Sequence, residues 1–181
     1  MAIRPKIVLV SGSPGAGKTT LAKPLAEKLG FSLISKDAIK ETLADHLKID
    51  FCDLDENRRI GGAAMEVMWK LAASCPRIVL EANFRPRSDY ERSKIEALDG
   101  KIIEVYCKCS VEEASRRFSE RARSKDHHPV HTFREMPPEM IAHFGQPIGV
   151  GRLIEVDTEK TVSVYEISKT IGEIFREQFT D

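Results

Sequence analysis

Gly12-Ser13-Pro14-Gly15-Ala16-Gly17-Lys18-Thr19 is the stretch that decides the fold of this 181-residue chain. It fits the pattern G-x-x-x-x-G-K-[ST], a glycine-rich loop whose backbone N–H groups cradle phosphates. The apolar run Lys6-Ile7-Val8-Leu9-Val10 before it predicts a buried strand, and apolar residues at helical spacing from Leu21 to Leu29 predict a helix after it. Because this order of strand, loop and helix is the context that the motif requires, we expect a nucleoside triphosphate site rather than an ordinary turn.

The residue types of the loop predict its contacts with a nucleotide. The loop N–H groups and the positive end of the following helix would face the phosphates. Lys18 would reach the β- and γ-phosphate oxygens, and the Thr19 hydroxyl would bind Mg²⁺. The predicted nucleotide-binding residues of this stretch are Gly12, Ser13, Pro14, Gly15, Ala16, Gly17, Lys18, Thr19 and Thr20.

Composition narrows the class of protein. The length suits one domain over residues 1–181, and a hydrophobic content of 41% is enough for a sizeable core. Zero net charge argues against sequence-independent binding to nucleic acid, which needs a basic surface. The four cysteines lack the spacing of a metal site or a disulfide framework. The first apolar run is too short for a signal peptide and no run has the length of a membrane span, so we expect a cytoplasmic protein without membrane contact.

Short apolar strands alternate with helical patterns along the whole chain. This alternation predicts an α/β fold, with a five-stranded parallel sheet and helices on both of its faces. Within a helix predicted from Asp55 to about Ser74, Gly61-Gly62 indicates a close approach or a break. Ser110 and Glu113 predict a capping box for a helix over 111–122. The predicted strands cover residues 6–10, 31–35, 77–81, 101–107 and 152–157.

Ligands of such sheets bind at the carboxyl ends of the strands, and several polar residues follow the predicted strands directly. Asp37 is a candidate general base or orienting group for an acceptor hydroxyl, and its alternative role is the N-cap of the next helix. Glu81 is a candidate ligand of Mg²⁺ or of its water, with a capping carboxylate as the alternative. Lys40, Asn83 and Arg85 are further candidates for substrate contacts.

A basic stretch from Arg116 to His131 is the second informative segment. Arg117 and Arg121 are four residues apart and so share one helix face, and the chain continues into a loop with three histidines. We predict a lid over about 117–138 whose arginines stabilise the charge of a transferring phosphoryl group. The alternative is an exposed basic surface. Zinc binding by the histidines is not favoured, because their spacing matches no common ligand set.

These residues together resemble a group of small P-loop kinases that includes predicted ATP-dependent kinases and the polynucleotide-kinase-like, gluconate-kinase-like and zeta-toxin-like enzymes. The resemblance covers essentially the whole chain. It depends on the loop Gly12–Thr19, on Ser35–Lys40, on Glu81–Phe84, and on Arg117-Phe118-x-x-Arg121 leading to His128-Pro129-x-His131.

The resemblance implies roles for individual residues. It assigns Asp37 to the acceptor hydroxyl, assigns Arg117 and Arg121 to the nucleotide phosphates, and places Asp157 and Thr158 beside the adenine of ATP. The lid of that group usually reads Arg-His-Pro, whereas this chain has His127-His128-Pro129. The residue that completes the charge clamp therefore stays open, since lysine does not reproduce the bidentate fork of arginine.

The leading hypothesis is an enzyme that moves the γ-phosphoryl group of Mg·ATP to a hydroxyl of a small molecule. Two further enzyme classes stay open, a 5′-hydroxyl polynucleotide kinase and a nucleoside monophosphate kinase. The second would need additional arginines for the acceptor phosphate, for which Arg58 and Arg59 are candidates. A nucleotide-dependent switch or binding module is the alternative outside the enzymes.

Overall fold

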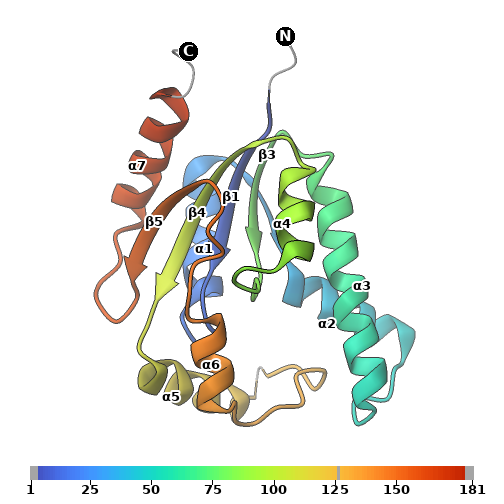
Figure 1. The fold of residues 1–181 in the computed structure, drawn as a ribbon. Helices are drawn as coiled ribbons and strands as arrows, with labels where there is room; N and C mark the ends of the chain where they lie inside the picture. The colour runs from blue at the N-terminus through green and yellow to red at the C-terminus, as the bar shows by residue number, and fades with distance from the viewer. Residues whose placement is uncertain (1–3, 126, 178–181) are drawn as a thin grey trace.

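The computed structural model describes residues 4–125 and 127–177. Within them, five strands form one parallel sheet in the order β2-β3-β1-β4-β5, which confirms the predicted α/β fold (Figure 1). Each predicted strand is present, with ends shifted by at most one residue. The strands are β1 (Lys6–Ser11), β2 (Ser32–Ser35), β3 (Arg77–Glu81), β4 (Lys101–Lys108) and β5 (Arg152–Asp157).

Helices cover both faces of this sheet, because successive side chains of each strand point to opposite faces. On one face, Val8 and Val10 of β1 pack with α1 and α7, while Ile7 and Leu9 pack with α3 and α4 on the other. Figure 1 shows α2, α5 and α6 at the carboxyl ends of the strands. The helices are α1 (Lys18–Leu29), α2 (Lys36–Leu47), α3 (Leu54–Ala72), α4 (Asp89–Glu96), α5 (Val111–Ala122), α6 (Pro138–Phe144) and α7 (Val164–Glu177).

Two local predictions about helices need correction. Gly61-Gly62 does not break α3, which runs through both glycines because Ile60 and Ala64 bury one face of it. The capping box of α5 is only half formed. Ser110 Oγ accepts a hydrogen bond from the Glu113 N–H at 3.3 Å, but the Ser110 N–H donates to Glu159 instead. The Glu113 carboxylate is bound by arginines of its own helix.

The predicted lid segment, residues 117–138, comprises the second half of α5 and an irregular stretch that ends at α6. Residue 126 of this segment lies outside the described residues. The sequence did not predict α6, a short helix that starts with Pro138 at its first position. Figure 1 shows the irregular stretch running below the sheet from α5 toward α2 and α3.

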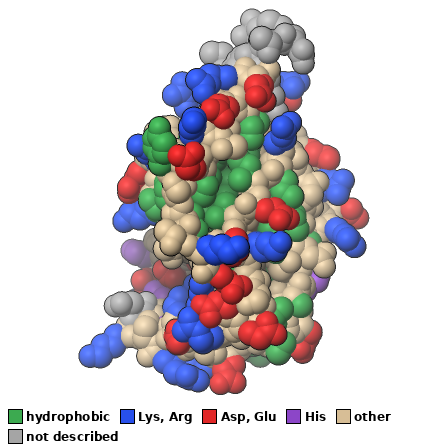
Figure 2. Space-filling view, turned by 90° about the vertical axis from the view of Figure 1, so that its left-hand side faces the viewer, with side chains coloured by type: hydrophobic (Ala, Val, Ile, Leu, Met, Phe, Trp, Pro, Cys, Tyr) green, Lys and Arg blue, Asp and Glu red, His purple; other side chains and the backbone are tan. Residues whose placement is uncertain are grey.

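The surface on the side of β5 and α7 carries charges of both signs. Figure 2 shows Lys and Arg side chains interspersed with Asp and Glu around a hydrophobic patch, so neither sign dominates this face. Among the helices of residues 4–125 and 127–177, none is long and apolar enough to span a membrane.

Candidate active site

The phosphate-binding loop connects β1 to α1 and packs tightly at two of its glycines. A Cβ atom at Gly12 would lie 2.6 Å from the Cys107 carbonyl oxygen, and one at Gly15 would lie 2.1 Å from the Ala114 carbonyl oxygen. Both residues also have positive φ, at 137° and 86°. The loop therefore requires glycine at these positions to reach its shape, since a side chain would collide with the backbone of neighbouring elements.

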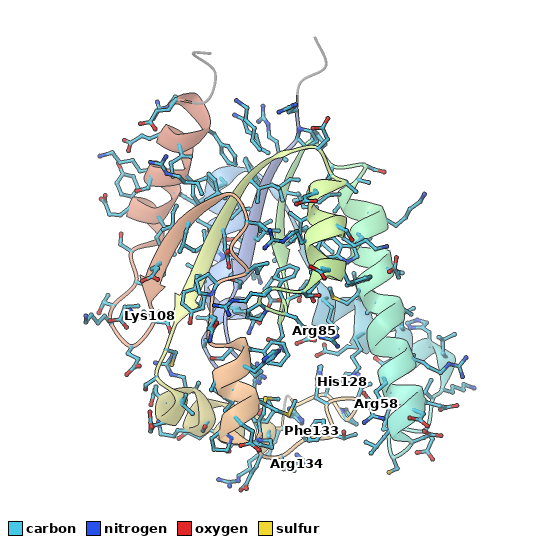
Figure 3. The ribbon with its side chains drawn as sticks, in the orientation of Figure 1. Arg58, Arg85, Lys108, His128, Phe133 and Arg134 are labelled. Carbon is cyan, nitrogen blue, oxygen red and sulfur yellow. The ribbon has the colours of Figure 1, made fainter. Side chains whose placement is uncertain are left out.

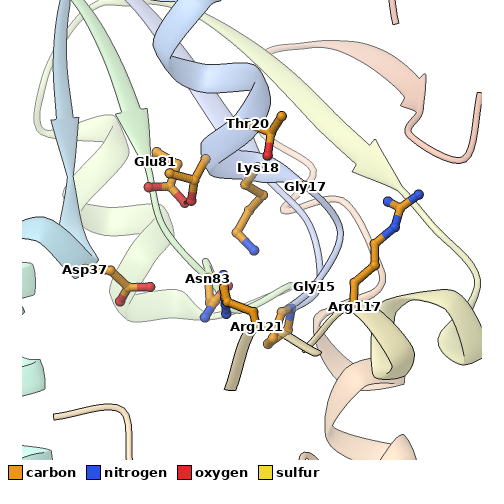
Figure 4. Close-up of a pocket in the computed structure, with 11 residues that line it drawn as sticks. Gly15, Gly17, Lys18, Thr20, Asp37, Glu81, Asn83, Arg117 and Arg121 are labelled. Carbon is orange, nitrogen blue, oxygen red and sulfur yellow. Dashed lines mark hydrogen bonds between the residues drawn. The ribbon is translucent and has the colours of Figure 1, made fainter. Parts of the chain in front are cut away.

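Lys18 is almost fully buried, and its ammonium group points into the hollow of the loop (Figure 4). Its Nζ donates a hydrogen bond to the Ser13 carbonyl oxygen at 2.8 Å. Burial lowers the pKa of Lys18, and the nearby Glu81 and Asp37 carboxylates counteract this effect. An ammonium group has three protons, so Lys18 keeps donors for an anion that enters the hollow.

Thr19 and Glu81, the two predicted metal ligands, lie together although 62 residues separate them in sequence. Thr19 Oγ1 donates to Glu81 Oε1 at 3.2 Å, and Ser35 Oγ donates to Glu81 Oε2. Hydroxyl and carboxylate oxygens are ligands that Mg²⁺ accepts, and this ion is usually held by one or two protein groups together with water and substrate phosphates. The described residues contain no cluster of three His, Cys, Asp or Glu that would hold a metal alone. The donor set therefore fits Mg²⁺ bound jointly with phosphates.

Asp37 lies in the first turn of α2, at the edge of the same hollow (Figure 4). Its alternative role as N-cap is wrong, because Ser35 occupies that position. Lys36 Nζ lies 3.1 Å from Asp37 Oδ1. Burial alone would raise the pKa of the Asp37 carboxyl, but the charges of Lys36 and His131 outweigh it and hold the pKa below its ordinary value. Asp37 is therefore ionised at neutral pH and can accept a hydrogen bond.

The two predicted lid arginines occupy different places. Arg121 lines the hollow with Gly15 (Figure 4), and its guanidinium lies 5.6 Å from the centre of the Phe118 ring without a hydrogen bond or ion pair to the described residues. Arg117 turns the other way. Its Nε donates to Glu113 at 2.6 Å, and one terminal nitrogen donates to the Thr158 carbonyl oxygen at 3.1 Å. Arg121 thus has free donors in the hollow, whereas those of Arg117 are partly used.

Three cavities adjoin one another across this end of the sheet. The middle one, about 160 Å³ in volume, is the hollow of the phosphate-binding loop and contains Lys18 and Glu81. We name it the phosphate cavity. Its lining residues are Pro14, Gly15, Gly17, Lys18, Thr19, Thr20, Asp37, Glu81, Asn83, Arg117 and Arg121.

A second cavity opens on the α7 side of the loop and shares Gly17, Thr20 and Arg117 with the phosphate cavity. Its volume is about 470 Å³, and we name it the base cavity because of its apolar wall. Thr158 lines it, as predicted for a residue beside the adenine. Asp157 does not, since its carboxylate is paired with Lys160 at 2.8 Å and lies outside both cavities. The full lining is Gly17, Thr20, Leu21, Arg117, Thr158, Lys160, Val162 and Val164.

A third cavity of about 130 Å³ lies on the α2 side, and we name it the acceptor cavity. It is enclosed by α2, α3, α5 and the irregular stretch, and it shares Asp37, Asn83 and Arg121 with the phosphate cavity. Its other lining residues are Lys36, Lys40, Asn57, Phe118, His127, Val130, His131, Thr132, Phe133 and Met136. The sequence could have identified Lys36 as a lining residue because it adjoins the candidate Asp37. No local sequence feature identifies Asn57.

Side chains of α2 and α3 hold the irregular stretch over the acceptor cavity. Lys40 Nζ and Asn57 Nδ2 both donate to the Val130 carbonyl oxygen, at 3.3 and 2.8 Å. His131 Nε2 lies 2.8 Å from Glu41, and His128 Nε2 lies 3.1 Å from Asp45. Figure 3 shows His128 on the side of this stretch that faces α3.

Glu104 of β4, which the sequence did not single out, anchors the chain that returns from α6. It is fully buried, and its carboxylate accepts hydrogen bonds from Ser11 Oγ at 2.6 Å and from the Ile148 and Gly149 N–H groups at 2.7 and 3.0 Å. Two residues further along β4, the Tyr106 hydroxyl donates to the Gly145 carbonyl oxygen at 2.6 Å. Ser11 directly precedes the phosphate-binding loop, so Glu104 connects that loop to the chain that follows α6.

Residues 7–144 match the AAA domain family. The chain belongs to that family. A solved structure of a protein named "putative kinase" from Chloroflexus aurantiacus J-10-fl superposes on this AAA domain with a TM-score of 0.81 and 27% identity, covering 94% of this chain and 98% of that one. The fold is therefore that of P-loop kinases.

Two curated relatives of this AAA domain protein are kinases by name. The shikimate kinase of Thermobifida fusca is 40% identical over 79 residues, which are 44% of this chain and 45% of that protein. The cytidylate kinase of Methanocella arvoryzae is 31% identical over 129 residues, which are 69% of this chain and 66% of that protein. The matched region covers less than two thirds of either relative, and the two names differ in the acceptor.

Proposed function

We propose that this protein is a kinase that moves the γ-phosphoryl group of Mg·ATP to a hydroxyl of a small molecule. The observation that carries the proposal is that Asp37, Asn83 and Arg121 line both the phosphate cavity and the acceptor cavity. A hydroxyl beside Asp37 would therefore lie next to the end of a triphosphate held by the loop. The kinase names of the relatives support the reaction type without identifying the acceptor.

In this proposal the phosphate cavity binds and orients the triphosphate. Lys18 and the loop N–H groups bind its β- and γ-oxygens, and the free donors of Arg121 face the group that is transferred. The Thr19 hydroxyl and the Glu81 carboxylate would hold Mg²⁺, which when bound neutralises charge on the phosphate oxygens. Arg117, Thr158 and the apolar wall of the base cavity would receive the adenine.

Asp37 would orient the acceptor hydroxyl by accepting its hydrogen bond. The acceptor oxygen forms a bond to the γ-phosphorus while the bond from that phosphorus to the β–γ bridging oxygen breaks, and ADP leaves. The hydroxyl proton passes to Asp37 and then to water. Since the Asp37 pKa is held low, this carboxylate is a weak base. Positioning is then its main contribution, which suits the loose transition state of phosphoryl transfer.

The placement of Arg58 and Arg59 does not favour a nucleoside monophosphate kinase. Arg58 pairs with Asp55 on the outer side of α3, with 78% of its side chain exposed, and Arg59 lines a groove between α2 and α3. Neither arginine lines the acceptor cavity. The arginines that such an acceptor phosphate would need are therefore not supplied by these two residues.

Transfer of labelled γ-phosphate from Mg·ATP into a deproteinised metabolite extract tests the proposal. A labelled small molecule that is absent with Lys18→Ala supports a kinase, whereas label that appears only as free phosphate favours a nucleotide-dependent switch. Asp37→Asn should lower kcat about 10²-fold and leave the KM for ATP nearly unchanged, because the neutral amide keeps the size of Asp37 but orients the acceptor hydroxyl less firmly than the carboxylate does. Unchanged turnover in this variant would remove Asp37 from the mechanism.

A further inference from the structure

The cationic groups of the acceptor cavity exceed its carboxylates. Lys36, Lys40 and Arg121 line it, and Asp37 is the one carboxylate among its described lining residues. A cavity with this balance attracts an anion, because an anionic group that enters it offsets the surplus positive charge and accepts charge-assisted hydrogen bonds. Which cations are free for a ligand depends on the hydrogen bonds that each already makes.

Lys40 is committed to the protein. Its Nζ donates to Asn57 Oδ1 at 2.5 Å and to the Val130 carbonyl oxygen at 3.3 Å, which uses two of its three protons. Burial also lowers the pKa of Lys40 to about 8. The role of Lys40 is to hold the irregular stretch against α2, and it is a poor candidate for ligand binding.

Lys36 and Arg121 keep their donors. Lys36 Nζ makes one polar contact among the described residues, with Asp37 Oδ1, and its side chain is 20% exposed. The guanidinium of Arg121 makes no hydrogen bond or ion pair within residues 4–125 and 127–177. Because Lys36 adjoins Asp37, an anionic group bound by Lys36 would hold a hydroxyl of the same molecule beside the Asp37 carboxylate.

The size of the cavity limits the ligand. Its volume of about 130 Å³ makes it the smallest of the three adjoining cavities. Apolar side chains of Phe118, Phe133 and Met136 form part of its wall. We expect a compound of a few carbons to fit this space.

We propose that the acceptor is a small hydroxy acid, whose anionic group is bound by Lys36 and whose hydroxyl is bound by Asp37. This inference rests on the proposed kinase function and identifies the substrate class of the same site. The reaction is the transfer described above, with the phosphate ester formed on the hydroxyl oxygen and the anionic group unchanged. The anionic group is a carboxylate or a phosphate, and the experiment distinguishes them.

Binding measured without turnover tests the inference. The protein is first saturated with Mg²⁺ and a non-hydrolysable ATP analogue. Ligand-observed NMR titrations then measure the binding of glycerate, glyceramide, glycerol 3-phosphate and cytidine 5′-monophosphate. A second series uses hydroxy acids of three to six carbons and their amides. Loss of one charge-assisted hydrogen bond corresponds to about 10- to 100-fold in affinity. We therefore expect at least one hydroxy acid to bind about 10- to 100-fold more tightly than its amide. Tighter binding of glycerate than of glycerol 3-phosphate identifies a carboxylate, and the reverse order a phosphate.

Lys36→Met should abolish this preference for the anion and leave the affinity for the ATP analogue unchanged. Lys36→Arg should restore most of the preference, and Lys70→Met, on the exposed face of α3, should behave as the wild type. Equal binding of every acid and its amide, a preference that survives in Lys36→Met, or tightest binding of cytidine monophosphate would each overturn the inference. Absence of label transfer to any acceptor, with the binding preference intact, would instead overturn the kinase function.

Discussion

Glu91 provides a sharp test of the electrostatics in this structure. It lies on α4, is 3% exposed, and its Oε2 accepts a hydrogen bond from the Arg85 N–H in the loop that follows Asn83. Burial raises the pKa of its carboxyl to about 7, and the Arg85 N–H and charge only partly oppose this effect. The perturbation is Glu91→Gln, which keeps an oxygen for the Arg85 N–H and removes the ionisation.

The sign and size of the effect follow from proton linkage. The Glu91 carboxyl titrates near 4.5 in the unfolded chain and near 7 in the folded protein, so the folded state binds more protons between these values. The free energy of unfolding of the wild type therefore falls as pH rises through this window, and the loss is complete above about pH 7. A shift of this size corresponds to at most about 3 kcal/mol, at about 1.4 kcal/mol for each pH unit.

Urea unfolding at pH 4.5, 6, 7 and 8 measures this effect as a difference between proteins. Glu91→Gln should match the wild type at pH 4.5 and be more stable by up to about 3 kcal/mol at pH 8. Glu96→Gln, on the exposed side of the same helix, is the matched control and should run parallel to the wild type. A constant difference between Glu91→Gln and the wild type at every pH would show that the Glu91 carboxyl titrates normally and would refute the reasoning.

Two further predictions concern the glycines and the cysteines. Gly15→Ala places a Cβ atom 2.1 Å from the Ala114 carbonyl oxygen at a φ of +86°, so ATP binding measured by calorimetry should be lost. Gly62→Ala is the control, because its Cβ atom meets nothing within 4 Å inside α3. It should stabilise the protein by about 0.5–1 kcal/mol in urea unfolding. Wild-type ATP affinity in Gly15→Ala would contradict the packing of the loop. Burial raises the pKa of the Cys107 thiol to about 12. Iodoacetamide at pH 8 should therefore label the exposed Cys52 in the native protein and Cys107 only after unfolding, as measured by peptide mass spectrometry. Labelling of native Cys107 would contradict its burial.

Local signals predicted most of the fold. The strands are apolar runs bounded by polar residues, and the phosphate-binding loop is a single continuous stretch, so both could be read without knowing the tertiary structure. The helix α6 was missed because it is short and lies in a polar stretch where prolines obscure helical periodicity. Of the two interpretations of Gly61-Gly62, the break in α3 is wrong, because tertiary packing of its buried face compensates for the low helix propensity of glycine.

The acceptor cavity could not be predicted in the same way, because it is assembled from distant segments. Lys40 and Val130 are 90 residues apart, and Asn57 and Val130 are 73 apart. No local sequence pattern shows which lysine of α2 keeps free hydrogen-bond donors and which one binds the irregular stretch at Val130. The sequence could therefore single out Asp37 as a candidate, but not distinguish the roles of Lys36 and Lys40.

The buried carboxylate of Glu104 has a consequence for how such proteins can diversify. Hydrogen bonds from Tyr106 and to Glu104 fix the backbone at Gly145 and at Ile148–Gly149. On the other side, the regular helix α5 ends at Ala122. The span between these attachments contributes no strand to the sheet, so we expect its exchange to leave the sheet register intact if the buried side chains of Val130 and Ile141 are retained. Grafting this span between relatives, with the junctions kept outside Ala122 and Gly145, is therefore a practical route to new acceptor specificity on an unchanged ATP-binding scaffold.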